Sequence, residues 1–247
     1  AANNTANGYQ ALYSNTTGSS NTANGLRALY YNTTGYYNTA NGYQSLYYNT
    51  TGNSNTAAGY QALKSNTTGY KNTANGYGAL QNNTTGYYNT ANGYRALYYN
   101  TTGFSNTANG YAALYNNIGG NNNTANGLNA LYSNTTGSNN TAIGYGANVG
   151  SGNLSNATAI GNGATVTGSN KVRIGNSSVS VIEGQVAWTS VSDGRIKENV
   201  QEAVAGLSFI AELRPVTYTL NTRKQDAINM QAMPDSIQEE RMLSDDE

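Results

Sequence analysis

Hydrophobic and polar positions along the first 140 residues repeat with a period of seventeen. The unit reads NTANGYQALYSNTTGSS from Asn4, and it returns at every seventeenth residue up to Asn140. A unit this short is typical of one coil of a parallel β-solenoid, since helical hairpin repeats need about thirty residues or more. One leucine is invariant, and we expect it to point inward and to stack on its copy about 4.8 Å away. These leucines are Leu12, Leu29, Leu46, Leu63, Leu80, Leu97, Leu114 and Leu131.

Two glycines mark each unit. The first follows an Asn-Thr-Ala step and one further residue, as at Gly8, Gly25 and Gly42, and the second closes the unit, as at Gly18. Glycine takes positive φ without steric cost, so we expect a bend of the chain at each of them. The pattern therefore predicts two bends in every coil.

Two short segments between the bends alternate like β-strands, and in the first unit they are Thr5–Asn7 and Ala11–Tyr13. In the second segment Leu12 faces inward, so Ala11 is predicted on the opposite face of the strand. The tyrosine that follows the first glycine is expected to cover the edge of the leucine ladder. Asn and Thr fill the remaining constant positions, and we expect stacked copies of them to hydrogen-bond from coil to coil.

Each coil has only a small hydrophobic core, made of one leucine, two alanines and one or two tyrosines. Burial of so little apolar surface does not offset the conformational entropy lost when an isolated coil is ordered. Burial between subunits would remedy this. We therefore predict a homo-oligomer whose coils pack around a common axis.

Charge separates the chain into two regions. Charged side chains make up 10% of the 247 residues, against about 25% in an average soluble domain, and the formal net charge is zero. Every acidic residue lies from Glu183 onward, and the first 170 residues carry only the cations Arg27, Lys64, Lys71 and Arg95. These scattered cations do not form the basic patch that phosphate binding needs, so nucleic acid is not expected as a partner. The low net charge, many tyrosines and few prolines also argue against disorder.

Several kinds of chemistry lack the residues they need. The chain has no His and no Cys, which excludes the usual zinc, haem and thiol sites as well as disulfides, and we expect no cofactor. The repeats contain no Asp, which disfavours calcium. No apolar run approaches the roughly 18 residues of a membrane span. Matches to the N-glycosylation pattern follow from the Asn- and Thr-rich composition, so modification is the minor interpretation.

The repeat changes after about residue 140. Isoleucine then precedes the marker glycine, at Ile143, Ile160 and Ile174, and the last marker interval shortens to fourteen residues. With its NTAIGYGANVGSGN and ATAIGNGATVTGSN strings, the segment 140–176 resembles the head repeats of trimeric autotransporter adhesins. That resemblance implies a left-handed parallel β-roll in which three chains pack into a stiff rod displayed at a surface.

The repeat dissolves after Lys171, and the pattern predicts a different set of elements. Alternation predicts short strands at Val172–Ile174 and Val179–Ile182. Apolar residues at helical spacing predict a helix that is capped by Ser192-Asp193 and ends before Pro215. A strand at Val216–Leu220 and a second helix over 235–246 complete the predicted elements.

The strings SDGRIKENV from Ser192 and LRPVTYTL from Leu213 resemble the intramolecular chaperone domain at the C-terminus of phage tail spikes and fibres, including endosialidases. In that family the domain helps the fibre to form trimers and is often released by self-cleavage before a serine. The resemblance assigns that serine to Ser192 and the lysine acting as its base to Lys197. A desolvated lysine deprotonates a serine hydroxyl in Ser-Lys hydrolytic pairs. The plain alternative is that Ser192 caps a helix and Lys197 is solvated.

These features predict a mainly β fold, a parallel β-roll or β-solenoid of seventeen-residue and then fourteen-residue coils, trimeric, with a small C-terminal α+β module. The predicted division of the chain is seventeen-residue repeats over 1–139, adhesin-head-like repeats over 140–176, a β connector over 177–191 and a partial chaperone-like module over 192–247.

The leading interpretation of function is a structural fibre, either a tail fibre or an adhesive appendage, exposed outside the cell or on a virion. Its expected partners are copies of itself and a cell-surface glycan or protein receptor, since adjacent tyrosine pairs can stack on sugars or on partner surfaces. Those tyrosines serve equally well as packing between coils or chains. The alternatives are single-turnover autoproteolysis through Ser192 and Lys197, and ice binding by threonine ladders on a flat face.

Overall fold

The computed structural model describes residues 3–183, and the regular secondary structure within them is β throughout. Contacts divide the chain into two units, Ala1–Glu183 and Gly184–Glu247, and every described strand belongs to the first unit. Its strands are β1 (Thr5–Asn7), β2 (Thr22–Asn24), β3 (Thr39–Asn41), β4 (Thr56–Ala58), β5 (Thr73–Asn75), β6 (Thr90–Asn92), β7 (Thr107–Asn109), β8 (Thr124–Asn126), β9 (Thr141–Ile143), β10 (Asn148–Val149), β11 (Thr158–Ile160), β12 (Thr165–Val166) and β13 (Val172–Ile174).

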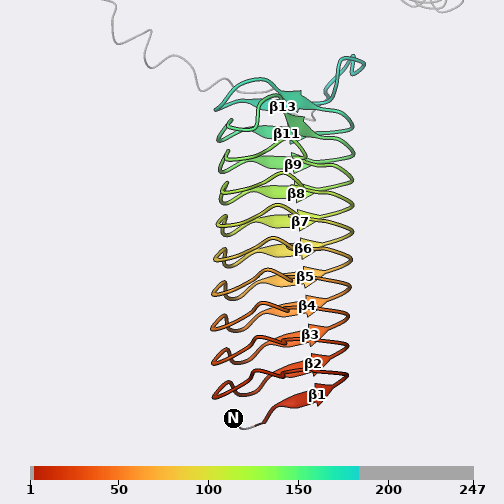
Figure 1. Cartoon of the computed structure of the whole chain (residues 1–247). Helices are drawn as coiled ribbons and strands as arrows, with labels where there is room; N and C mark the ends of the chain where they lie inside the picture. Colours follow the sequence, from red (N-terminus) through yellow and green to blue (C-terminus); the bar gives the residue numbers. More distant parts are fainter. Residues whose placement is uncertain (1–2, 184–247) are drawn as a thin grey trace, which may run out of the picture. The chain divides into compact units, whose positions relative to one another are not determined.

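The strands stack into a parallel solenoid, as the period of seventeen predicted. One sheet of 11 strands runs β1 to β9, then β11 and β13, and β10 and β12 form a second, two-stranded parallel sheet. Figure 1 shows the arrows one above another, one for each coil. The register repeats the sequence, so Thr5 pairs with Thr22 and Ala6 with Ala23. The same sheet continues past residue 140, and its last step, from Thr158 to Val172, is the shorter interval of fourteen.

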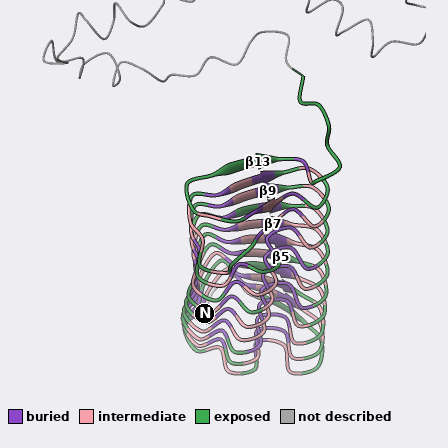
Figure 2. Ribbon diagram, turned by 90° about the horizontal axis from the view of Figure 1, so that it is seen from above, coloured by how far each residue is buried: buried purple, intermediate pink, exposed green. Residues whose placement is uncertain are grey.

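The leucine ladder lies inside the coils. Leu29 and its equivalents up to Leu131 are fully buried within a single chain, and Leu12 in the first coil is 9% exposed. The central alanine of nearly every strand, such as Ala23, is buried beside them. Figure 2, a view from above the stack, shows buried positions recurring at the same place in successive coils. One chain therefore closes its own core, and the homo-oligomer stays a prediction that core burial does not require.

The predicted strand at Ala11–Tyr13 is wrong. This segment is a turn, and Leu12 and all its equivalents have φ between 50° and 53°, in the left-handed region. The turn brings the preceding residue inward as well, so Ala28 is as fully buried as Leu29 rather than on an opposite face. The backbone amide of Leu29 donates to the carbonyl of Ser45 in the next coil at 3.0 Å, which supports this uncommon backbone for a leucine.

The second glycine of each unit has a different role from the one predicted. Gly35 does not have positive φ, unlike Gly42, whose φ is 136°. A Cβ at Gly35 would lie 2.5 Å from the carbonyl oxygen of Gly52 and 2.7 Å from Nδ2 of Asn49. Glycine is therefore needed here because two coils and an asparagine side chain approach one another closely.

Buried asparagine ladders hold these close coils together. The backbone amide of Asn38 donates to Oδ1 of Asn21 at 2.9 Å, and its Nδ2 donates to the carbonyl of Gly52 at 2.8 Å. In a second ladder, Nδ2 of Asn49 donates to Oδ1 of Asn32 at 2.7 Å and to the same Gly52 carbonyl at 2.9 Å. All four asparagines are fully buried, so hydrogen-bonded amides complete a core that leucine and alanine fill only in part.

Threonines form three rows along the stack, and two of them differ in their surroundings. One row directly follows the second asparagine ladder in the sequence. In it, Oγ1 of Thr33 donates to the carbonyl of Thr50 at 3.0 Å, and the same bond recurs in neighbouring coils. The strand threonines, such as Thr22 and Thr39, are partly exposed on the long sheet. A regular threonine face of this kind is what the ice-binding interpretation assumes, and that interpretation stays a prediction.

The end of the described chain differs from the prediction. β13 forms as expected, but Val179–Ile182 is not a strand, because a turn at Asn176 takes the chain away from the sheet and leaves these residues exposed. The predicted helix after Ser192, the strand at Val216–Leu220 and the helix over 235–246 lie outside the described residues. In residues 3–183 no helix is long and apolar enough to cross a membrane.

Candidate functional site on the tyrosine rows

Several rows of stacked aromatic rings run along the outside of the stack, and two tyrosine rows among them flank the candidate site. The first row follows the first glycine of each unit, and its neighbouring rings stack with centroids 4.8–5.2 Å apart. These rings lie outside the buried core and are 37–53% exposed, and their covering of the edge of the leucine ladder stays a prediction. The first row consists of Tyr43, Tyr60, Tyr77, Tyr94 and Tyr111.

The second tyrosine row follows the leucine of each unit and is interrupted in the middle. Three rings stack in the first coils, and three stack again further along, with centroids 5.2–5.3 Å apart. Several carry an edge-to-face partner at the next residue, as Tyr98 does with Tyr99. Stacking between coils is thus one established role of the tyrosine pairs. The second row consists of Tyr13, Tyr30 and Tyr47, then Tyr98, Tyr115 and Tyr132.

A central row of side chains lies between the two tyrosine rows, two residues after each first glycine. In the early coils its members bond to one another: Nε of Arg27 donates to Oε1 of Gln10, and Nε2 of Gln61 donates to Oε1 of Gln44, both at 2.9 Å. The row is then broken by residues too small to reach a neighbour. Its members are Gln10, Arg27, Gln44, Gln61, Gly78, Arg95, Ala112 and Asn129.

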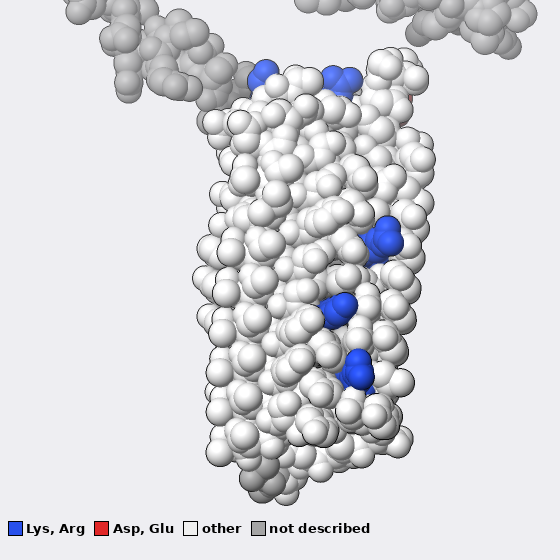
Figure 3. All heavy atoms as spheres, viewed as in Figure 1, with Lys and Arg blue, Asp and Glu red and all other residues white. Residues whose placement is uncertain are grey.

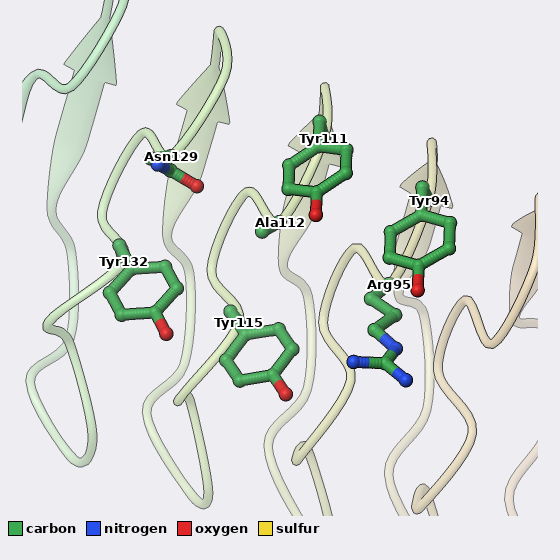
Figure 4. A pocket seen from close by; sticks show the side chains of 7 residues that line it. All are labelled: Tyr94, Arg95, Tyr111, Ala112, Tyr115, Asn129 and Tyr132. Carbon is green, nitrogen blue, oxygen red and sulfur yellow. The ribbon is translucent and has the colours of Figure 1, made fainter.

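A cleft opens where the central row reaches Ala112. It has a volume of about 270 Å³, with Tyr94 and Tyr111 of the first row on one side and Tyr115 and Tyr132 of the second row on the other. Figure 4 shows Ala112 between the two pairs of rings. Glutamine holds the same position in earlier coils, and the methyl group of Ala112 is much smaller. We call this hollow the Ala112 cleft.

Arg95 lines one end of the Ala112 cleft. Its guanidinium carbon lies 5.1 Å from the ring centroid of Tyr94 and 5.2 Å from that of Tyr98, within the range of cation–π attraction. Nε of Arg95 is buried and has no hydrogen-bond partner among residues 3–183. Arg27, in contrast, has the side chain of Gln10 as its acceptor one coil earlier. The residue one coil before Arg95 is Gly78, which has no side chain to accept the bond.

Neutral hydrogen-bonding groups complete the Ala112 cleft. Asn129 lines the end opposite Arg95, and its side-chain amide makes no hydrogen bond within the part of the chain that the structure describes. Burial, with a side-chain hydrogen bond to Tyr99, raises the pKa of the Tyr115 hydroxyl above its ordinary value. That hydroxyl is therefore protonated at neutral pH, and Arg95 carries the only charge in the lining.

A second hollow of about 440 Å³ offers fewer groups for binding a ligand. It lies between the stacked rings of Tyr31 and Tyr48 and the threonine row. The hydroxyls of Thr33, Thr50 and Thr67 already donate to backbone carbonyls, and no charged side chain lines this hollow. Figure 3 shows basic groups as separate patches on one face of the stack.

The residues predicted from sequence as a catalytic pair are not part of these hollows. Ser192 and Lys197 lie outside the described residues. The leucines and the glycines Gly8, Gly25 and Gly42 are placed in the core and at the strand ends, where they support the stack. Sequence reasoning noticed the tyrosine pairs but missed Arg95 and Ala112, although the break in the central row can be read once the period is known.

Residues 192–232 match a family described as the chaperone of endosialidase. The match begins at Ser192 and includes Lys197, and it supports the chaperone-like module expected from the SDGRIKENV and LRPVTYTL strings. Comparisons with curated proteins and with solved structures find no match. A β-solenoid joined to an endosialidase-type chaperone module fits a fibre protein of the kind that phages carry.

Proposed function

We propose that this chain is a structural fibre protein that attaches a virion, or an adhesive appendage, to a surface or host receptor. The observation that carries the proposal is the pairing of a β-solenoid with a segment that matches the chaperone of endosialidase. A virion-surface location follows from the same pairing. The expected receptor is a cell-surface glycan or protein.

The solenoid suits the mechanical part of this role. Each coil bonds to its neighbours through backbone amides, asparagine ladders and stacked tyrosines, so the column extends by adding identical junctions. The exposed tyrosine rows supply large, rigid contact surfaces at low cost in side-chain entropy. We further propose that three chains assemble side by side, as the adhesin-head resemblance of 140–176 implies.

The chain, labelled with a fluorophore, is expected to bind some members of a panel of bacterial strains that differ in surface polysaccharide. Periodate treatment of the cells would remove binding to a glycan receptor, and protease treatment would remove binding to a protein. Albumin labelled in the same way serves as the control. Binding no stronger than that of albumin across the whole panel would contradict the attachment function.

A second candidate function is self-cleavage before Ser192, and it is favoured because the family match begins at that serine. In the proposed step the amine of Lys197 takes the proton of the Ser192 hydroxyl, and the oxygen attacks the carbonyl carbon of Val191. An ester replaces the peptide bond as the amine leaves with a proton, and water then hydrolyses the ester.

Mass spectrometry of the purified chain is expected to find two fragments, one ending at Val191 and one starting at Ser192. Ser192→Ala removes the nucleophile, so this variant should give a single mass near 26.0 kDa. The neighbouring substitution Ser190→Ala is the control and should leave the cut in place. An uncut wild-type chain, or a cut that persists in Ser192→Ala, would exclude the mechanism.

A further inference from the structure

We propose that the Ala112 cleft binds a pyranose ring that carries a carboxylate, one unit of an acidic surface polysaccharide. The proposal rests on the attachment function proposed above and names the chemistry of its receptor. It is carried by three features of the cleft: its size, its aromatic walls and the unpaired cation at one end.

The size of the cleft suits a single sugar residue. Its volume of about 270 Å³ lies just below the roughly 300–1,000 Å³ of pockets that hold drug-sized ligands. The cleft is a shallow hollow between two side-chain rows, so a polysaccharide could continue along the surface on either side. An extended chain with one ring seated at Ala112 is the binding mode that this shape allows.

The walls offer flat aromatic surfaces on both sides. Tyr94 and Tyr111 stack with centroids 5.0 Å apart, and Tyr115 and Tyr132 with centroids 5.3 Å apart. Figure 4 shows all four rings nearly face-on, so their faces are turned toward the side from which the cleft is viewed. The C–H groups of a pyranose pack against such faces, and rings already held by stacking lose little entropy when they do.

The charge requirement comes from Arg95. Its guanidinium is held between tyrosine rings, its Nε is buried without an acceptor among residues 3–183, and the first acidic residue of the chain is Glu183, so a ligand anion would meet the terminal Nη groups. A guanidinium offers parallel N–H donors that match a carboxylate, and such charge-assisted bonds are stronger than neutral ones. A uronic-acid unit would supply the anion that this guanidinium lacks within the described part of the chain.

The remaining polar groups match sugar hydroxyls. The Asn129 amide provides both a donor and an acceptor at the end away from Arg95. The Tyr115 hydroxyl keeps its proton at neutral pH because its pKa is raised by burial and by the bond to Tyr99. The sugar would therefore lie with its carboxylate toward Arg95 and its neutral, hydroxyl-rich edge toward Asn129. In this orientation the polar groups at both ends of the cleft have hydrogen-bond partners.

Calorimetry with the full chain tests this, with oligogalacturonate and hyaluronan oligosaccharides as acidic probes and the methyl ester of oligogalacturonate as the neutral match. We expect at least one acidic probe to bind with Kd of about 1 mM or tighter, and the ester about tenfold more weakly. Arg95→Gln should lower the affinity for the acidic probe to that for the ester. If neither acidic probe binds, or the ester binds equally well, the proposal is wrong.

Ala112→Gln gives the matched test of the cleft itself. Glutamine already occupies this row at Gln44 and Gln61 with φ of 51° and 53°, against 51° at Ala112, so the backbone accepts the change while the side chain fills the gap. We expect binding of the acidic probe to fall at least about tenfold. Gln61→Ala alters the same row away from the cleft and should leave binding unchanged. Unchanged affinity in Ala112→Gln would overturn the assignment.

The cleft and the attachment function can fail separately. A chain that adheres to bacteria but binds neither acidic probe would keep the attachment function and refute the cleft. A chain that binds an acidic probe through Ala112 and Arg95 but adheres to no strain would refute attachment and keep the site. The same variants on whole cells then show whether the cleft accounts for adhesion.

Discussion

Replacing Gly42 with alanine is expected to lower the free energy of unfolding by about 2–6 kcal/mol. Gly42 directly follows β3 with φ of 136°, and holding an L side chain in that region costs about 1–3 kcal/mol. The new Cβ would also lie 2.5 Å from the carbonyl oxygen of Gly59 and 2.8 Å from its carbonyl carbon. These are backbone atoms of the next coil, so the two coils must move apart and lose part of their packing, which adds about 1–3 kcal/mol.

Two other glycines separate the clash from the backbone strain. Gly146 has φ of 62°, in the left-handed region that non-glycine residues also adopt, and a Cβ there would meet nothing within 4 Å, so Gly146→Ala measures that milder strain without a clash. A Cβ at Gly119 would meet only Oγ1 of Thr102, at 3.4 Å, so Gly119→Ala should be nearly neutral. Urea unfolding followed by circular dichroism compares the three variants. A Gly42→Ala chain that unfolds at the same urea concentration as Gly119→Ala would show that the coils are not spaced as described.

The solenoid could be predicted from the sequence because two of its structural requirements make residue types recur at a fixed interval along the chain. A residue that lies inside every coil must be repeated, which is how Leu29 and its copies indicate the core. A polar group that is buried in every coil must find a partner, and in a stack the partner is its own copy, as for Asn32 and Asn49. Both arguments need only spacing and residue type.

The conformation between those positions could not be predicted in the same way. Leucine rarely takes positive φ, so no local preference at Leu12 indicates a left-handed turn instead of a strand. The cost is offset by the neighbouring coil, where the amide of Leu12 donates to the carbonyl of Ala28 at 3.1 Å. At Gly35 a Cβ would meet the backbone of Gly52 and the side chain of Asn49 in the next coil, as well as Asn32 in its own coil. Tertiary contact decides both positions.

The candidate site was hidden for a different reason. Repeats draw attention to what is constant, whereas the Ala112 cleft exists because one coil departs from its neighbours. Gly78 removes the acceptor that Gln10 gives to Arg27, and Ala112 removes the side chain that would fill the gap. In a repeat protein, a variable position beside an aromatic row can set binding specificity without altering the constant residues that hold the repeats together.

Replacing Asn83 with aspartate is expected to destabilise the solenoid by about 3–5 kcal/mol at pH 7. Nδ2 of Asn83 donates to Oδ1 of Asn66 at 2.8 Å and to the carbonyl of Gly86 at 3.0 Å, and Oδ1 of Asn83 accepts from Nδ2 of Asn100 at 2.7 Å. The side chain is fully buried. Aspartate has nearly the same shape but no N–H donors, so an ionised carboxylate would face two oxygen atoms without water to separate them.

The loss of stability in Asn83→Asp should grow as the pH rises. Burial and the two facing oxygens disfavour the charged form, so the pKa of the introduced carboxyl is raised in the folded state above the value of about 3.9 in the unfolded chain. Below about pH 3.9 both states hold the proton, and the protonated group can still donate one hydrogen bond. As the pH rises further the unfolded chain releases its proton first, so stability falls by up to about 1.4 kcal/mol per pH unit until the raised pKa is reached.

Urea unfolding of Asn83→Asp and of the wild-type chain at pH 4 and pH 7 measures the loss of stability at each pH. The other carboxyls titrate in both proteins, so their contributions cancel when the two are compared. The matched control is Asn75→Asp, which alters an exposed asparagine whose Nδ2 donates to Oδ1 of Asn92 at 2.8 Å. Water can solvate a carboxylate there, so we expect a loss below about 1 kcal/mol with little change between the two pH values. Equal losses in the two variants at pH 7 would mean that the buried asparagine ladder does not hold the coils together.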